Sequence, residues 1–158
     1  MLSEGDPAPD VTVEGMDGQP ISLANYRGQK LVVYFYPKDD TSGCTREAQD
    51  FTAFASEFEN AGAWVLGVSK DDAAKHRKFT DKYELKIPLA TDRDGSVCEA
   101  FGTWIQKSMY GRKYMGIDRA TFLIDGDGVV QRIWRGVKVP GHAEEVLTAA
   151  RDLKSRGS

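Results

Sequence analysis

The chain has 158 residues, which predicts one compact domain over residues 1–158. Its net charge is −3 at pH 7 and it has no basic block, so we do not expect it to bind nucleic acid. No apolar run approaches the length of a membrane span, so we expect no membrane partner. The acidic, polar start is unlike a signal peptide, and two distant cysteines do not form a secreted disulfide framework, so we expect a cytoplasmic protein.

Strands and helices alternate in the first two thirds of the chain. An extended lead-in over residues 5–10 precedes a hairpin whose arms, 11–13 and 20–23, flank an Asp-Gly turn. The continuously apolar run 31–36 predicts a central strand that is covered on both faces. Apolar spacing and a terminal glycine then predict, in order, a helix over 44–61, a strand over 63–69, a helix over 71–83, a strand over 89–91 and a short helix over 95–101.

The last third of the chain predicts antiparallel structure. Residues 120–124 and 129–134 flank a four-residue Asp/Gly loop, which is typical of a hairpin, and a helix follows over 143–153. Parallel pairing early and antiparallel pairing late imply a mixed sheet with helices on both faces. We therefore predict an α/β protein with a thioredoxin-like fold and an N-terminal β-hairpin extension.

Cys44 is the first candidate functional residue. It ends the octapeptide Pro37-Lys38-Asp39-Asp40-Thr41-Ser42-Gly43-Cys44, which follows the central strand and opens the 44–61 helix. A thiol in the first turn of a helix lies among unpaired N–H groups at the positive end of the helix dipole. Both features favour the thiolate, which is the reactive form of cysteine. The pattern therefore indicates a thiol-based redox enzyme.

Several neighbouring residues have simpler interpretations. Thr41 can cap the helix, and residues 38–40 are expected to form a solvated loop. His76 and His142 stand apart from each other and from the octapeptide, so we expect no metal site.

Several motifs, in one order along residues 2–152, resemble those of the peroxiredoxins. Their signature is Pro37-x-x-x-Thr41-x-x-Cys44. Five further segments resemble the bacterioferritin comigratory protein (Q-type) subgroup of the family. They are Tyr34-Phe35-Tyr36-Pro37-Lys38, Gly43-Cys44-Thr45-x-Glu47, Val65-Leu66-Gly67-Val68-Ser69, Cys98-Glu99-Ala100-Phe101-Gly102 and Arg119-x-Thr121-Phe122-Leu123-Ile124-Asp125. Since the motifs are collinear, chance is a poor explanation for them.

The resemblance implies a thiol-dependent peroxidase that reduces hydrogen peroxide and organic hydroperoxides through a sulfenic acid on Cys44. It needs neither an organic cofactor nor a metal. It also implies that Arg119 stabilises the thiolate, that the Thr41 hydroxyl contacts the peroxide, and that Pro37 fixes the loop and shields the sulfur. Backbone N–H groups of Gly43 and Cys44 are the remaining donors.

Cys98 is the one other thiol in the sequence, and its role stays open. Many relatives carry a resolving cysteine five residues after the peroxidatic one, where this chain has Gln49, or in the next helix, where Thr80 stands. Cys98 either resolves the sulfenic acid as a disulfide or packs in the core while an external thiol reduces Cys44. A disulfide would require Cα atoms within about 7 Å, so the one-cysteine cycle is slightly favoured.

The expected partners are a hydroperoxide and a reductant that is thioredoxin, glutaredoxin or a small thiol. We expect a monomer, which is common in the resembled subgroup. A general thiol–disulfide oxidoreductase is disfavoured because Thr41 stands where a Cys-x-x-Cys motif would have its first cysteine. A peroxide sensor or chaperone-like protein that uses Cys44 as a trigger is the alternative from another class.

Overall fold

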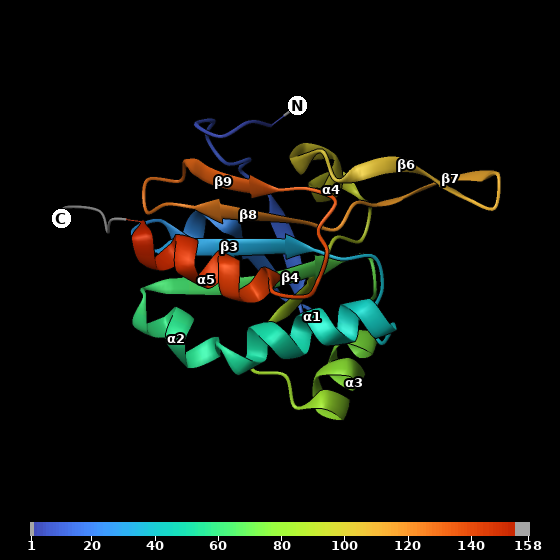
Figure 1. The fold of residues 1–158 in the computed structure, drawn as a ribbon, viewed down its shortest axis with the longest axis horizontal. Coiled ribbons are helices and arrows are strands. Elements are labelled where there is room, and N and C mark those ends of the chain that lie inside the picture. The colour runs from blue at the N-terminus through green and yellow to red at the C-terminus, as the bar shows by residue number, and fades with distance from the viewer. Residues whose placement is uncertain (1, 154–158) are drawn as a thin grey trace.

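A computed structural model describes residues 2–153, so residue 1 and residues 154–158 of the predicted domain lie outside it. Within the described chain a seven-stranded sheet has the order β2-β1-β5-β4-β3-β8-β9 (Figure 1). Its strands are β1 (Thr12–Gly15), β2 (Pro20–Ser22), β3 (Lys30–Phe35), β4 (Ala63–Ser69), β5 (Leu89–Thr91), β8 (Ala120–Ile124) and β9 (Val130–Trp134). None of the helices in residues 2–153 is both long and apolar enough to cross a membrane.

The centre of the sheet is β3, every residue of which is buried. It pairs parallel with β4 and antiparallel with β8, and β4 pairs parallel with β5. Successive side chains of a strand point to opposite faces, so Val32 and Tyr34 enter one apolar cluster while Val33 and Phe35 enter the other. The predicted mixed sheet is confirmed, and its two faces have separate cores.

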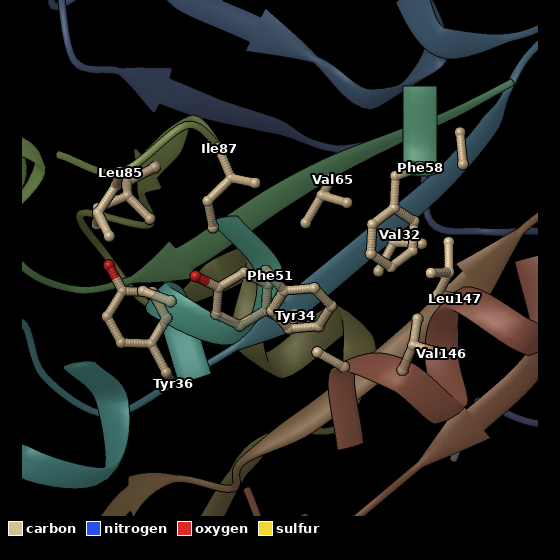
Figure 2. Packing of buried hydrophobic residues seen from close by; sticks show 14 of the residues in the cluster. Val32, Tyr34, Tyr36, Phe51, Phe58, Val65, Leu85, Ile87, Val146 and Leu147 are labelled. Carbon is tan, nitrogen blue, oxygen red and sulfur yellow. The ribbon is translucent and has the colours of Figure 1, made fainter. Parts of the chain in front are cut away.

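Helices cover both faces of the sheet, as predicted. The first face carries α1 (Ser42–Ala53), α2 (Ala55–Asn60), α3 (Ala73–Tyr83) and α5 (His142–Asp152), whose buried side chains share one cluster. The second face carries α4 (Ser96–Phe101) and the 3₁₀ turn η1 (Leu23–Tyr26). Figure 2 shows the first cluster, in which the rings of Tyr34 from β3 and Phe51 from α1 stack with centroids 4.6 Å apart.

The single helix predicted over 44–61 is wrong in one respect, since the structure has two helices, α1 and α2. The chain leaves helical geometry at Phe54, with φ −103° and ψ 10°. This redirection allows Phe51 of α1 and Phe58 of α2 both to be fully buried in the first cluster. Gly62 follows α2 with φ +74°, a left-handed conformation that glycine adopts without strain.

A second hairpin, β6 (Trp104–Met109) with β7 (Arg112–Ile117), has no counterpart in the sequence-based prediction. It forms a separate two-stranded sheet and projects away from the body of the molecule (Figure 1). Because most of its side chains are exposed, the strands lack the buried apolar alternation by which a strand is recognised.

Candidate active site

Cys44 lies at the start of α1, just after the loop that follows β3. The strand ends at Phe35, a short loop follows, and α1 begins at Ser42, so that Cys44 is the third residue of the helix. Its side chain is buried in the first cluster, with 1% of the residue exposed. The N–H groups of Gly43 and Cys44 belong to the first helical turn and have no intrahelical acceptor. The predicted position of the thiol at a helix start is therefore what the structure has.

Arg119 joins Cys44 to a carboxylate. It immediately precedes β8, whose antiparallel pairing with β3 places Ala120 opposite Phe35 at the end of the strand from which the Cys44 loop leaves. The guanidinium donates from Nη2 to Cys44 Sγ at 3.3 Å and from Nη1 to Glu47 Oε1 at 2.6 Å. Arg119 thus presents one edge to the thiol and another to Glu47, which uses the fixed fork of the guanidinium.

Gly43 leaves room for this arrangement. A Cβ atom at this position would lie 3.3 Å from Arg119 Nη2, which is closer than most real contacts of a Cβ. The absence of a side chain at position 43 therefore lets the guanidinium reach the sulfur over the first turn of α1.

Glu47 is buried with an incomplete set of hydrogen bonds. Only 1% of it is exposed, and its Oε2 has no hydrogen-bond partner among residues 2–153. Burial raises the pKa of Glu47 to about 7 even though Arg119 acts to lower it. Burial also opposes the charge on Arg119, but the Glu47 carboxylate and the Cys44 sulfur raise its pKa above the ordinary value. The site therefore holds a permanent cation between a thiol and a carboxyl that titrates near neutral pH.

Tyr34 belongs to the same buried cluster as Cys44 and lies within electrostatic range of Glu47 and Arg119. It is fully buried, its hydroxyl has no hydrogen-bond partner in the described chain, and burial together with Glu47 and Cys44 raises its pKa well above the ordinary value. Gly67 of β4 makes space for the ring, because a Cβ there would lie 2.7 Å from Tyr34 Cζ. The phenol is therefore protonated and adds no charge beside the site.

Thr41 and Pro37 border the site from the loop. The Thr41 hydroxyl donates to the Lys38 carbonyl at 2.9 Å, and the Thr41 carbonyl accepts from the Thr45 N–H at 2.8 Å. Its side chain therefore does not cap the helix, contrary to one of the interpretations above, although Thr41 occupies the N-cap position. Pro37 is exposed at the start of the loop, directly after the buried Tyr36.

The loop is anchored to α3 by Asp39, so the expectation of a fully solvated loop is wrong for this residue. Asp39 is buried, with Oδ2 2.6 Å from His76 Nδ1 and Oδ1 accepting from the Tyr36 hydroxyl at 2.5 Å. Its backbone N–H donates to Asp71 Oδ2 at 2.8 Å. His76 is fully buried, and its Nε2 lies 3.0 Å from the carbonyl oxygen of Ala90. The histidine predicted to stand apart from the octapeptide is in fact bonded to it.

Asp40 forms a second, exposed anchor to α3. Its carboxylate accepts from the Tyr83 hydroxyl at 2.7 Å and from Lys82 Nζ at 2.9 Å, and these bonds lower its pKa. Its backbone has φ +60°, a left-handed conformation that aspartate tolerates better than most residues. The loop that leads to Cys44 is thus held to α3 by two successive carboxylates.

Cys98 lies on the other face of the sheet. It is fully buried with the residues of the second cluster, whereas Cys44 belongs to the first. Its backbone N–H donates to Asp92 Oδ2 at 2.7 Å, and burial, with Asp92, raises the pKa of its thiol to about 12. Both cysteines are free thiols in the structure. The structure therefore does not bring Cys98 to Cys44.

His142 opens α5 and is hydrogen-bonded to β8 rather than to Cys44. Its Nε2 lies 2.8 Å from the Thr121 hydroxyl, and burial lowers its pKa to about 4. No group of three or more histidine, cysteine or acidic side chains within residues 2–153 is placed to hold a metal ion.

Of the residues predicted for the site, Cys44 and Arg119 are in direct contact, and Thr41 and Pro37 lie in the adjoining loop. Glu47 lies within one of the motifs that resemble the peroxiredoxins, but the resemblance implies no role for it. Its spacing of three from Cys44, on a helix face that is otherwise apolar, is a signal that could have identified it. Asp39 and His76 carried no comparable signal, because they are far apart in sequence.

Comparison with known proteins assigns the family. The model of the AhpC/TSA family matches residues 4–133. The chain belongs to this family. Among curated peroxiredoxins of the Bcp group, the putative protein of Coxiella burnetii is 46% identical over 146 residues, covering 92% of this chain and 97% of the relative. The Bacillus subtilis Bcp is 42% identical over 152 residues, covering 96% of this chain and 97% of that protein.

Solved peroxiredoxin structures share the fold. The Xanthomonas campestris Bacterioferritin Comigratory Protein, studied for its alkyl peroxide reduction activity, has a TM-score of 0.86 and 43% identity over 91% of this chain and 92% of that one. PrxQ of Xylella fastidiosa has a TM-score of 0.89 and 38% identity over 94% and 95%. The predicted thioredoxin-like fold and the resemblance to Q-type peroxiredoxins are confirmed. The protein is a peroxiredoxin, which makes it a thiol-dependent peroxidase.

Proposed function

We propose that Cys44 is the peroxidatic residue of this peroxiredoxin. The thiolate attacks one oxygen of the hydroperoxide, an S–O bond forms and the O–O bond breaks. Cys44 becomes a sulfenic acid, and the departing oxygen takes up a proton and leaves as water or an alcohol. The observation that carries the proposal is the 3.3 Å bond from Arg119 Nη2 to Cys44 Sγ, since a fixed cation stabilises both the thiolate and the departing oxyanion.

The rest of the pocket orients the peroxide. The first-turn N–H groups of Gly43 and Cys44 are donors for the peroxide oxygens, and the Thr41 hydroxyl lies at the adjoining helix N-cap. Pro37 restricts the loop and shields the sulfur from water. Glu47 orients the guanidinium through its 2.6 Å bond to Nη1. The alkyl peroxide reduction described for the Xanthomonas protein supports organic hydroperoxides as substrates here.

We propose a one-cysteine cycle, in which a thiol from another molecule reduces the sulfenic acid. Cys98 supports this assignment by its burial in the opposite core and by the pKa of about 12 of its thiol, which disfavours the thiolate. The reductant is thioredoxin, glutaredoxin or a small thiol. We further propose a cytoplasmic monomer formed by a single domain. A light-scattering mass of twice the chain mass would contradict the monomer.

The test is an intact mass of the reduced protein, under non-reducing conditions, after one equivalent of hydrogen peroxide. We expect one added oxygen that maps to Cys44 and is lost in Cys44→Ser. A loss of two hydrogens that maps to Cys44 and Cys98 would instead establish an intramolecular disulfide. Full peroxide consumption by Cys44→Ser would exclude Cys44 as the nucleophile. Turnover with thioredoxin is expected to be unchanged in Cys98→Ser.

A further inference from the structure

The β6–β7 hairpin concentrates the exposed apolar side chains of the molecule. Of the five large apolar residues exposed within residues 2–153, four lie on it, namely Met109 (57%), Tyr110 (101%), Tyr114 (42%) and Met115 (50%). Scattered apolar side chains are ordinary on a protein surface, but a group of this kind on a projecting element is typical of an interaction site.

Tyr110 occupies a position that is unfavourable for tyrosine. The turn that joins Met109 to Arg112 has two residues, Tyr110 with φ +52° and Gly111 with φ +77°. Turns of this geometry favour asparagine, aspartate or glycine, because other side chains are strained at positive φ. Since the backbone of Tyr110 is strained and its ring is fully exposed, the folded monomer gains no burial from this aromatic side chain, which points to a contact outside it.

The hairpin is also basic. It carries Lys107, Arg112 and Lys113 and has no acidic residue between Trp104 and Ile117, in a chain whose net charge is −3. A two-fold contact between the hairpins of two copies would set these cations against each other. The charge therefore favours a different, acidic partner over a second copy of this chain.

The base of the hairpin adjoins the active site. Strand β7 ends at Ile117, only two residues before Arg119, whose guanidinium holds the Cys44 sulfur. Burial lowers the pKa of Lys107, while Asp118 and Cys44 act to raise it and Arg119 to lower it, so this ammonium lies within electrostatic range of the site. From there β7 extends about 17 Å to the tip, at the usual rise of a strand. A protein that brought a thiol to Cys44 could therefore contact the hairpin at the same time.

We propose that the β6–β7 hairpin is the docking element for the protein dithiol that reduces Cys44, a partner with an acidic surface beside its reactive cysteine. The inference rests on the proposed external reduction of Cys44. One thiolate of the partner attacks the Cys44 sulfenic sulfur, an S–S bond forms, and the hydroxyl leaves as water. The partner's second thiol then displaces Cys44 and leaves the partner oxidised to a disulfide.

The experiment measures turnover with a thioredoxin of net negative charge, kept reduced by NADPH and its reductase. The variants are Tyr110→Asn and the double change Arg112→Glu with Lys113→Glu. We expect each to raise the KM for thioredoxin about tenfold. Turnover with dithiothreitol, and the rate of Cys44 oxidation in a single turnover without reductant, are expected to stay unchanged. Salt should lower kcat/KM for thioredoxin in the wild type and less so in the double variant.

Two matched controls separate docking from general surface effects. Lys78→Glu reverses an exposed charge on α3, and Trp64→Thr removes an exposed aromatic near the start of β4, at the other end of the sheet. Both are expected to leave the KM for thioredoxin unchanged. Tyr110→Asn also relieves the strained turn, so its melting temperature should rise while its affinity for thioredoxin falls.

An unchanged KM for thioredoxin in both hairpin variants would overturn the proposal. So would a wild type that turns over with dithiothreitol but with neither thioredoxin nor a glutaredoxin of net negative charge. Binding to phosphatidylglycerol vesicles, or dimerisation, that is lost in Tyr110→Asn without a change in the KM for thioredoxin would assign the hairpin to another partner. Failure of the proposed function would show earlier, as absence of peroxide-dependent oxidation at Cys44.

Discussion

His76 of α3 holds Asp39 of the active-site loop, with Nδ1 2.6 Å from Oδ2. Because the carbonyl of Ala90 can only accept, the His76 Nε2 that faces it at 3.0 Å carries a hydrogen. The ring is therefore fixed by β5 on one side and fixes the loop on the other. This contact connects the peroxide pocket to a helix that contributes no side chain to it.

We predict that His76→Leu lowers kcat/KM for peroxide about tenfold, because the loop that carries Thr41 loses its internal anchor. It should also lower the free energy of unfolding by about 2 kcal/mol, since Asp39 is left buried with fewer partners. The control is Phe58→Leu, which removes buried volume from the first cluster but lies on α2, a helix that is not among the hydrogen-bond partners of the loop in the described chain. Equal losses of kcat/KM in the two variants, measured well below their melting temperatures, would show that His76 acts through stability alone.

Arg119→Lys tests the geometry of the cation rather than its charge. An ammonium cannot contact the Cys44 sulfur and the Glu47 carboxylate through two fixed edges, as the guanidinium does. We expect kcat/KM for hydrogen peroxide to fall about 100-fold, measured by stopped-flow with no reductant present. A variant with nearly the wild-type rate would mean that positive charge is sufficient.

Gly43→Ala should separate activity from stability. Alanine restricts the unfolded chain more than glycine does, which is worth about 0.5 kcal/mol where the backbone φ is not positive, so the melting temperature should rise. The new methyl group would lie 3.3 Å from Arg119 Nη2, displace the guanidinium and slow the reaction with peroxide several-fold. Calorimetry and stopped-flow on the same sample check both directions. A rise in both quantities would show that the guanidinium can shift without loss.

Glu47 should make stability depend on pH. Its pKa is raised from 4.5 to about 7, so the folded protein keeps between these values a proton that the unfolded chain has lost. The free energy of unfolding therefore falls as pH rises from 4.5 to 7, and Glu47 accounts for about 3 kcal/mol of this fall. Because glutamine does not ionise, Glu47→Gln should remove that part of the pH dependence.

Urea unfolding of both proteins from pH 4.5 to 8 measures this contribution as the difference between two curves. The difference is needed because His142 acts in the opposite direction. Its pKa is lowered from 6.5 to about 4, so it destabilises the fold as pH falls through that range. Since His142 is present in both proteins, its effect cancels. Parallel curves would mean that Glu47 ionises normally.

The sequence was informative where structure is local or strongly patterned. The buried run before Pro37 and the helix after Thr41 placed Cys44 correctly, because a strand end and a helix start are both visible within a dozen residues. Arg119 lies 75 residues further on, so only the family resemblance could connect it to Cys44. The β3–β8 pairing that brings the two together is a long-range contact that no local pattern encodes.

The errors have a common physical cause. Asp39 was expected in solvent because a charged residue between turn formers is usually solvated, but His76, Tyr36 and Asp71 supply the bonds that make its burial tolerable. The β6–β7 hairpin was not predicted because only its base, at Trp104 and Ile117, packs on a core, and most of its side chains are exposed. In both cases tertiary contacts, or their absence, outweighed the local preference.

The sheet separates the two cysteines, so Cys98 can serve as a constant reference against which the oxidation of Cys44 is measured. At pH 8 a mild alkylating reagent meets a Cys44 sulfur that the Arg119 guanidinium contacts at a helix start, and a Cys98 thiol whose pKa of about 12 keeps it protonated in the opposite core. Cys44 should therefore be labelled first, and only while it is reduced. A second reagent of different mass, added after unfolding, would label Cys98 in every chain and so measure the total amount of the protein. The ratio of the two labels would report the fraction of reduced enzyme in a crude extract, with no mutation or antibody.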